Sequence, residues 1–178
     1  MLDLRLITES ASTEEFAEAM STLASGVVIV TCRVDGRPWG MTVTAFASIS
    51  ADPPTVLVSL RSDAPAALAI GSAQSFGVSI LAEGQLGVAH LGSKSDRSKF
   101  LEQFTGAREA SSASPAVAGA LAHLDCEVLE TVEIADHTVF FGRVRAARSS
   151  QAGAPLLYHR RTYRTLFPTE RTTTCRAN

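Results

Sequence analysis

Apolar side chains recur at helical spacing near the start of the chain. Four of them fall on one side of a helix drawn over residues 13–25: Phe16, Ala19, Met20 and Leu23. Thr13 is suited to cap this helix, Glu14 and Glu15 suit the positive end of its dipole, and Gly26 is suited to end it. The pattern predicts a short amphipathic helix with one buried face.

Beyond this helix the apolar pattern becomes that of β-strands. A β-branched run at 26–34 is followed by Asp35 and Gly36, a strong hairpin signal. The return strand is expected over 37–50, and prolines at 53 and 54 end it before a further strand at 55–61. Alternation predicts one face of Met41, Val43, Ala45, Ala47 and Ile49, and another of Thr42, Thr44, Phe46, Ser48 and Ser50.

The rest of the chain mixes strands with helical insertions. Asp63 is expected to cap a short helix with Pro65 in its first turn, and residues 83–104 combine helical pieces with a polar elbow at 92–99. A polar loop is expected at 106–115, and further strands at 76–81, 126–134, 138–147 and 155–166. This order predicts a mainly β (α+β) protein, a Greek-key barrel with short helical insertions. One domain would span residues 1–167, followed by a polar tail at 168–178.

Composition narrows the class of protein. The 178 residues suit one domain, and a hydrophobic share of 46% excludes a disordered chain. The net charge of −2 argues against a nucleic-acid binder, although residues 143–178 carry eight arginines against one acid. No stretch reaches the roughly 20 apolar residues of a membrane span, and the first ten residues lack a secretory core. Three cysteines without a CxxC pair favour buried thiols in the cytoplasm.

Common catalytic motifs are absent from the sequence. It contains no GxGxxG after a strand, no GxxxxGK[ST] loop, no HExxH and no GxSxG elbow. The four histidines are scattered without metal-ligand spacing: His90, His123, His137 and His159. Taken singly, each is more simply a surface histidine or one satisfied by its neighbours. A Rossmann dinucleotide site, a hydrolase and a metalloenzyme are therefore unsupported.

The return strand carries the most unusual polar pattern. Four hydroxyls share one face beside the small residues Gly40 and Ala45: Thr42, Thr44, Ser48 and Ser50. A flat ligand with carbonyl and ring-nitrogen groups could lie against such a strand. The same pattern is also ordinary for the solvent face of a half-buried strand.

Two other segments could bind an anion. Residues 59–63 leave a strand and enter a helix, so free backbone N–H groups would lie close to Arg61. The elbow at 92–99 alternates three basic residues with serines. The first pattern also fits a routine helix start, and the second also fits a solvated loop.

Two further groups contain aromatic or imidazole rings. Asp136 and His137 fall in a turn between strands, where a half-exposed histidine can orient or protonate a ligand. Residues 158–161 (YHRR) end an apolar strand with a ring and two guanidiniums, which suits a ring-stacking ligand that bears a diphosphate. The first group could also be a turn pair without a function, and the second a basic strand end without one.

As an ordered set, seven blocks resemble the flavin reductase family with the FMN-binding split-barrel fold. The resemblance runs from about Thr13 to Phe167, and no single block would suffice. The blocks are ASGVVIVT, GRPWGMTVTAFASISADPPTVLVSL, FGVSIL, GSKSDRSKF, LDCEV, ADHTVFFGRV and PLLYHRRTY. The resemblance implies a split β-barrel and an NAD(P)H-dependent flavin reductase. Such an enzyme passes hydride from NADH or NADPH to FMN or FAD and supplies reduced flavin to a partner monooxygenase.

The resemblance also implies positions for the ligands. Around the flavin ring and ribityl chain it places Pro38, Trp39, Gly40, Met41, Thr42, Thr44 and Ala45. On the ribityl-phosphate side it places Ser59, Leu60, Arg61, Ser62, Asp63, Ala64, Pro65 and Ala66, and at the phosphate Gly92, Ser93 and Lys99. His137 would lie near the nicotinamide as the catalytic residue, and the pyridine nucleotide would meet Tyr158, His159, Arg160 and Arg161. The family implies a homodimer with the flavin near the subunit interface.

Three positions depart from the family pattern. The fourth strand has Ser79 where VNVL is usual, Ala135 stands in the place of the glycine of GDH, and Arg161 replaces the glycine of a YRG-like segment. Two other hypotheses remain open on the sequence: a non-catalytic flavin-binding or storage protein on the same barrel, and an oxidoreductase that retains its flavin. FMN and FAD, and likewise NADH and NADPH, are not distinguished.

Overall fold

A computed structural model describes residues 11–94, 98–105, 113–150 and 153–166. The predicted tail at 168–178 and most of the predicted loop at 106–115 lie outside these residues. The helices are α1 (Thr13–Ser21), α2 (Pro65–Ala73) and α3 (Leu86–Ser93), with a short 3-10 helix at Glu102–Phe104. No helix in this part of the chain is long and apolar enough to cross a membrane.

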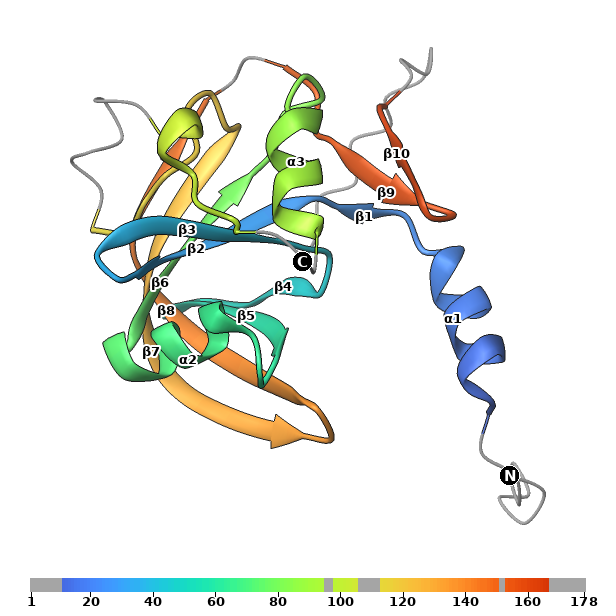
Figure 1. The fold of residues 1–178 in the computed structure, drawn as a ribbon, viewed down its shortest axis with the longest axis horizontal. Helices are drawn as coiled ribbons and strands as arrows, with labels where there is room; N and C mark the ends of the chain where they lie inside the picture. The colour runs from blue at the N-terminus through green and yellow to red at the C-terminus, as the bar shows by residue number, and fades with distance from the viewer. Residues whose placement is uncertain (1–10, 95–97, 106–112, 151–152, 167–178) are drawn as a thin grey trace.

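In the described residues, ten antiparallel strands form two sheets (Figure 1). The larger sheet has the order β3-β2-β6-β7-β8-β5-β4, and the smaller one β1-β9-β10. The strands are β1 (Ser25–Gly26), β2 (Val28–Val34), β3 (Arg37–Val43), β4 (Phe46–Ala51), β5 (Pro54–Arg61), β6 (Ser75–Ile80), β7 (Ala122–Ile134), β8 (His137–Ser149), β9 (Leu157–His159) and β10 (Thr162–Arg164). The hairpins β2–β3 and β4–β5 lie at opposite edges of the larger sheet, which makes the fold an open, mainly β barrel, as expected.

The β-branched run that forms β2 is buried on both of its faces. Val28 and Val30 point into one core with Val58, Phe76 and Phe140. Val27 and Ile29 point into a second core, with Leu81, Val88, Leu101 and Leu156. A continuous apolar run, rather than an alternating one, is what burial on both faces requires. The second core holds α3 against the barrel and so fixes the position of this helix.

The predicted single strand at 37–50 is wrong, because the chain breaks at Thr44 and Ala45. It leaves β3 at one edge of the larger sheet and begins β4 at the other edge. The break also inverts the predicted faces beyond it. Phe46 packs against the core, whereas Ile49 is 51% exposed. Alternation alone cannot reveal such a crossing, since the residue pattern on both sides of the break is that of a strand.

The ends of α1 and α2 differ from those expected. Ser12, rather than Thr13, caps α1, and it shares a capping box with Glu15. Ala64 occupies the N-cap of α2 without a side-chain cap, because the Asp63 carboxylate is bound by Arg61 instead. The single strand predicted at 155–166 is also wrong, since it is the hairpin β9–β10 with Arg160 and Arg161 in its turn.

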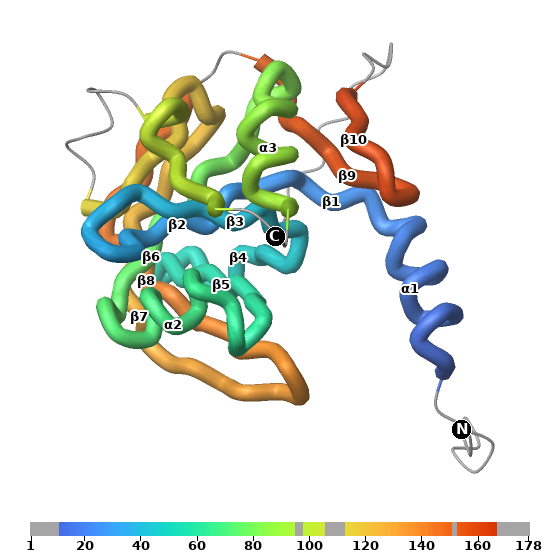
Figure 2. Tube along the Cα trace, in the orientation of Figure 1, coloured from blue at the N-terminus to red at the C-terminus, as the bar shows by residue number. Residues whose placement is uncertain are grey.

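The apolar face of α1 is not buried within the chain. No residue of this helix is buried, and Phe16, Met20 and Leu23 are 62%, 47% and 57% exposed. Figure 2 shows α1 standing away from the barrel. The prediction of a buried face therefore fails for a single copy of the chain.

A closed polar network lies between β6, β7 and the segment that precedes β7. Ser79 Oγ lies 2.9 Å from His123 Nδ1, and Ser114 Oγ lies 3.1 Å from His123 Nε2 and 2.5 Å from Asp125 Oδ1. Asp125 also accepts from the Ser114 N–H, and Ser79 Oγ from the Val117 N–H. Ser79, one of the departures from the family pattern, thus helps to hold a buried histidine, which confirms that His123 is satisfied by its neighbours.

The buried cysteines also agree with expectation. Cys32 and Cys126 are free thiols in the first core. Burial raises the pKa of each thiol to about 12, so neither is a reactive thiolate at neutral pH. Cys175 lies outside the described residues.

Candidate functional site

Two hollows meet on the surface between the small sheet and the loop that joins β3 to β4. The first, named here the α3 hollow, has a volume of about 660 Å³ and is lined by Val27, Thr42, Thr44, Leu86, His90, Ser93, Tyr158, Arg161, Thr162 and Tyr163. The second, the α1 hollow, measures about 710 Å³ and is lined by Ala17, Met20, Ser21, Leu23, Ser25, Thr44, Ala45, Phe46, Ala47, Leu57, Tyr158 and Arg161. Because Thr44, Tyr158 and Arg161 line both, the hollows form one trough. It contains six of the predicted site residues: Thr42, Thr44, Ala45, Ser93, Tyr158 and Arg161.

Thr42 and Gly92 hold α3 against β3 at the edge of the trough. A Cβ on Gly92 would lie only 2.5 Å from Thr42 Oγ1 and 2.7 Å from the Thr42 backbone nitrogen, so only glycine allows this approach. The Thr42 hydroxyl donates to the Ala89 carbonyl at 2.6 Å. Its proton is therefore committed, and Thr42 can offer a ligand only an acceptor.

Residues 38–41 lie beside the trough rather than in its walls. Pro38 and Gly40 exchange backbone hydrogen bonds with Leu101 and Lys99. Trp39 is buried with its ring edge-on to Phe100, and Met41 packs against the first core. Partial burial lowers the pKa of Lys99. This part of the PWGMT block thus joins β3 to the core and to the 99–101 segment.

The predicted residues on β5 continue the floor of the α1 hollow. Leu57, Ser59 and Arg61 share the outer face of β5, since Val58 and Leu60 between them are buried in the core. The Ser59 N–H donates to the carbonyl of Ala45, which lines the hollow. Arg61 pairs with His137 across β5 and β8, four residues from Leu57, or about 13 Å along the strand. His137 therefore lies at the far end of the same sheet face.

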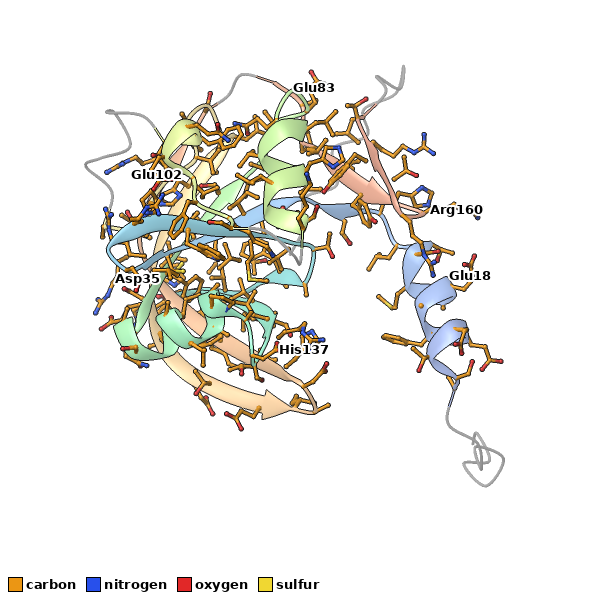
Figure 3. All side chains as sticks on the ribbon, viewed as in Figure 1. Glu18, Asp35, Glu83, Glu102, His137 and Arg160 are labelled. Carbon is orange, nitrogen blue, oxygen red and sulfur yellow. The ribbon has the colours of Figure 1, made fainter. Side chains whose placement is uncertain are left out.

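An exposed charge cluster surrounds His137. Arg61 binds Asp63 at 2.8 Å and Asp136 at 3.6 Å, and His137 Nδ1 lies 2.8 Å from Asp136 Oδ1. The hydrogen bond to Asp63 raises the pKa of Arg61, and that from His137 lowers the pKa of Asp136. With Asp136 ionised, Nδ1 carries the shared proton, which leaves Nε2 available to a ligand. Figure 3 labels His137, the first residue of β8, and Arg160 in the turn between β9 and β10.

The remaining residues of the 59–66 segment have mainly internal partners. The Ser62 and Ala64 N–H groups donate to Asp136 and Arg61 carbonyls, and the Ser62 hydroxyl meets that of Thr138. Leu60, Ala64 and Ala66 are buried, and Pro65 begins α2. The two carboxylates balance Arg61, so a phosphate here would depend on N–H groups in the first turn of α2.

Two departures from the family pattern fall where the backbone is left-handed. Ala135 has φ 53° and Arg161 has φ 59°, and Arg160 beside it has φ 47°. Glycine adopts this region freely, whereas an L side chain there costs roughly 1 kcal/mol. The positive φ that each turn requires therefore explains why the family has glycine at positions 135 and 161.

Sequence reasoning missed the histidine and the tyrosine that contact each other in the wall of the α3 hollow. The rings of His90 and Tyr163 lie 5.0 Å apart, edge to face. The sequence indicates His90 only as a surface histidine or one satisfied by its neighbours, and it places Tyr163 in a matched block without assigning it a role. The resemblance could have indicated Tyr163, but His90 carries no local signal.

Residues 20–166 match the family described as "Flavin reductase like domain". The chain belongs to the flavin reductase family. It is 36% identical to the reductase component of 4-nitrophenol 4-monooxygenase/4-nitrocatechol 2-monooxygenase of Rhodococcus opacus, over 82% of this chain and 77% of that one. It is also 36% identical to the NADH-dependent flavin reductase StyB of Pseudomonas fluorescens, over 79% of this chain and 81% of that one.

Solved flavin reductases have the same fold. BorF, the flavin reductase component of a bacterial two-component tryptophan halogenase, superposes with a TM-score of 0.78 at 33% identity, covering 89% of this chain and 100% of that one. SgcE6 of Streptomyces globisporus, an NADH:FAD oxidoreductase in complex with NAD and FAD fragments, gives a TM-score of 0.79 at 28% identity, covering 92% of this chain and 100% of that one. The expected split-barrel fold and the flavin reductase resemblance are confirmed.

Proposed function

We propose that this protein is an NADH-dependent flavin reductase that supplies reduced flavin to a partner monooxygenase. The observation that carries the proposal is the trough. Among the described residues, its walls contain tyrosine rings, the Thr44 hydroxyl and Arg161 but no carboxylate, which suits a flat, anionic ligand. Membership of the flavin reductase family and the named activities of its relatives favour catalysis over flavin storage.

The chain's own residues would bind and orient two planar substrates. Thr44 offers a hydroxyl, Thr42 an acceptor, and Arg161 a cation for phosphate. A flavin held there would supply the hydride acceptor, with NADH as the hydride donor. His137, held by Asp136, would use Nε2 to orient the nicotinamide carboxamide, while Tyr158 and the Arg160–Arg161 turn meet the rest of the nucleotide. Holding two rings in a near-attack arrangement supplies most of the rate enhancement that such a reaction needs from the protein.

The test of this function is a steady-state assay of NADH oxidation with FMN, FAD or riboflavin added. At least one flavin should support turnover well above the uncatalysed background, and NADH should be used better than NADPH. Adding a monooxygenase component from the same source should then couple NADH oxidation to hydroxylation. If no flavin supports NADH oxidation above the background, the proposal fails and the protein is a flavin-binding protein without reductase activity.

The functional unit is a homodimer in which a second copy covers the apolar face of α1. Phe16 and Met20 are exposed on a helix that stands off the barrel, Leu23 is exposed just after it, and the α1 hollow beside them has an apolar lining. A surface of this kind marks an interface. The dimer would place the trough at the subunit interface, in a protein that we locate in the cytoplasm.

Replacing Met20 by glutamate should dissociate this dimer, because a charge would be buried without a partner. Light scattering after gel filtration should give twice 18.8 kDa for the wild type and 18.8 kDa for Met20→Glu. Glu18→Gln, an exposed change on the same helix, should stay dimeric. A wild type that elutes as a monomer at micromolar concentration would contradict the proposed interface.

A further inference from the structure

Arg61, at the end of β5, pairs with two carboxylates. Its Nε and Nη2 donate to the two oxygens of Asp63 at 3.0 and 2.8 Å, and its Nη1 lies 3.6 Å from Asp136 Oδ2. The pKa of Asp63 is lowered by the bond from Arg61, and that of Asp136 is lowered by the bond from His137, so both are ionised at neutral pH. A phosphate at Arg61 would therefore meet two negative charges beside one positive charge.

Asp136 uses its two oxygens for two different partners. Its Oδ2 faces Arg61, whereas its Oδ1 lies 2.8 Å from His137 Nδ1. A carboxylate that is held through both oxygens has one orientation, and it passes that orientation to the imidazole that it binds. Arg61 is itself held by the two parallel bonds to Asp63. These four side chains thus form a chain of contacts that ends at His137.

The backbone under this chain of contacts is also fixed. Arg61 is the partner of His137 in the pairing of β5 with β8. The Ser62 N–H donates to the Asp136 carbonyl at 2.9 Å, and the Ser62 hydroxyl lies 2.8 Å from that of Thr138. What can still rotate is therefore the side chains. The side chain of His137 is 45% exposed, so packing alone does not fix its ring.

We propose that Arg61 is a positioning residue for the nicotinamide: it holds Asp136 in the orientation that directs His137 Nε2 toward the carboxamide, and it does not bind the flavin phosphate. This inference rests on the proposed function and deepens it. It differs from the role beside the ribityl phosphate that the family resemblance implies for Arg61. A single exposed ion pair would contribute little, but a bidentate arginine within a network of charges is the arrangement in which exposed pairs do contribute.

The first test separates turnover from flavin binding. Arg61→Gln should lower kcat for NADH-dependent flavin reduction about tenfold, because the imidazole would sample several orientations. Titration should give Kd values for FMN, FAD and riboflavin within about twofold of the wild type. Arg61→Lys keeps a cation without the planar fork, so its kcat should lie between the two. Arg145→Gln, which removes an exposed arginine of β8 paired with Glu127, should change neither kcat nor Kd.

The same titrations test the role implied by the resemblance. If Arg61 bound the phosphate, Arg61→Gln would weaken FMN and FAD about tenfold or more and leave riboflavin unchanged, since riboflavin has no phosphate. That pattern would overturn the proposal, and so would a kcat equal to that of the wild type.

A double-mutant cycle tests whether Arg61 acts through the histidine. In a His137→Ala background, Arg61→Gln should lower kcat by less than about twofold, because the group that it orients is already absent. A further loss of about tenfold in that background would mean that Arg61 acts independently of His137, and the proposal would fail.

A spectroscopic measurement tests the orientation without turnover. In protein labelled with ¹⁵N, the His137 ring is assigned by its absence from the spectrum of His137→Ala. The wild type should show the neutral ring with its proton on Nδ1, Arg61→Gln should show a mixture of both tautomers, and Arg145→Gln should match the wild type. Identical His137 shifts in Arg61→Gln and the wild type would overturn the proposal. A chain that oxidises no NADH would refute the proposed function, and the spectra would still decide whether Arg61 orients His137.

Discussion

Replacing His137 by alanine is expected to lower kcat for NADH-dependent flavin reduction about 100-fold, with the Kd for flavin changed by less than about threefold. Asp136 fixes the imidazole through a 2.8 Å bond to Nδ1, so Nε2 has a defined direction. Loss of this group removes an interaction that orients the nicotinamide, and an error of about 1 Å in the position of a reacting ring can cost that much in rate.

Rapid mixing of NADH with the flavin-loaded enzyme would measure the reduction step directly, and a flavin titration would give the Kd. His137→Gln, which keeps a hydrogen-bonding group, should recover part of the lost rate. A variant that loses flavin affinity and keeps its reduction rate would instead place His137 at the flavin.

Replacing Asp125 by alanine is expected to destabilise the fold by about 3 kcal/mol. The carboxylate accepts the Ser114 N–H and hydroxyl and lies 3.4 Å from His123, all within a buried network. Its removal leaves buried donors without partners, each worth about 1–3 kcal/mol. Glu127→Ala, two residues along β7, removes an exposed bond to Arg145 and should cost less than about 1 kcal/mol. Urea unfolding of the two variants gives both values.

The Asp125 effect should depend on pH. Burial raises the pKa of Asp125, but the bonds from Ser114 and the proximity of His123 outweigh it, so the pKa lies below its ordinary value of 3.8. A carboxyl whose pKa is lowered by folding contributes stability above its unfolded pKa, and that contribution is lost as the pH falls through the folded pKa. The difference between wild type and Asp125→Ala should thus be full near pH 7 and shrink below about pH 4. A difference that grew toward acid pH would contradict the assignment.

Local sequence patterns predicted much of the fold. The Asp35-Gly36 turn, the continuous apolar run of β2 and the long β7–β8 hairpin are confirmed, because each depends on residues close in sequence. The break at Thr44 and Ala45 was missed because alternation reports which side chains share a face of a strand, not which edge of a sheet the strand occupies. The exposed face of α1 was missed for a related reason, since periodicity identifies an apolar face but not what covers it.

The residues of the trough could be predicted from the sequence only in part. Thr44, Tyr158 and Arg161 could be selected from the family resemblance, since each lies in a matched block. His90 and Tyr163 could not be paired, because their contact joins α3 to β10 across more than 70 residues; the Tyr163 hydroxyl in the same contact donates to Ala89, 74 residues away. Contacts at such separation depend on the packing of both elements on a shared core.

The sequence by itself therefore determined the family, the strand content and the residues whose role is local. Only the tertiary structure decided that the hydroxyls of Thr42 and Thr44 differ, one committed to α3 and the other free to meet a ligand. It also decided that Arg161 stands between two hollows and that His137 lies along β5 from them. The physical reason is that the sequence specifies which side chains are present, whereas long-range packing decides which neighbours each one has. Those neighbours determine whether its hydrogen-bonding groups and charge are already paired or remain available to a ligand.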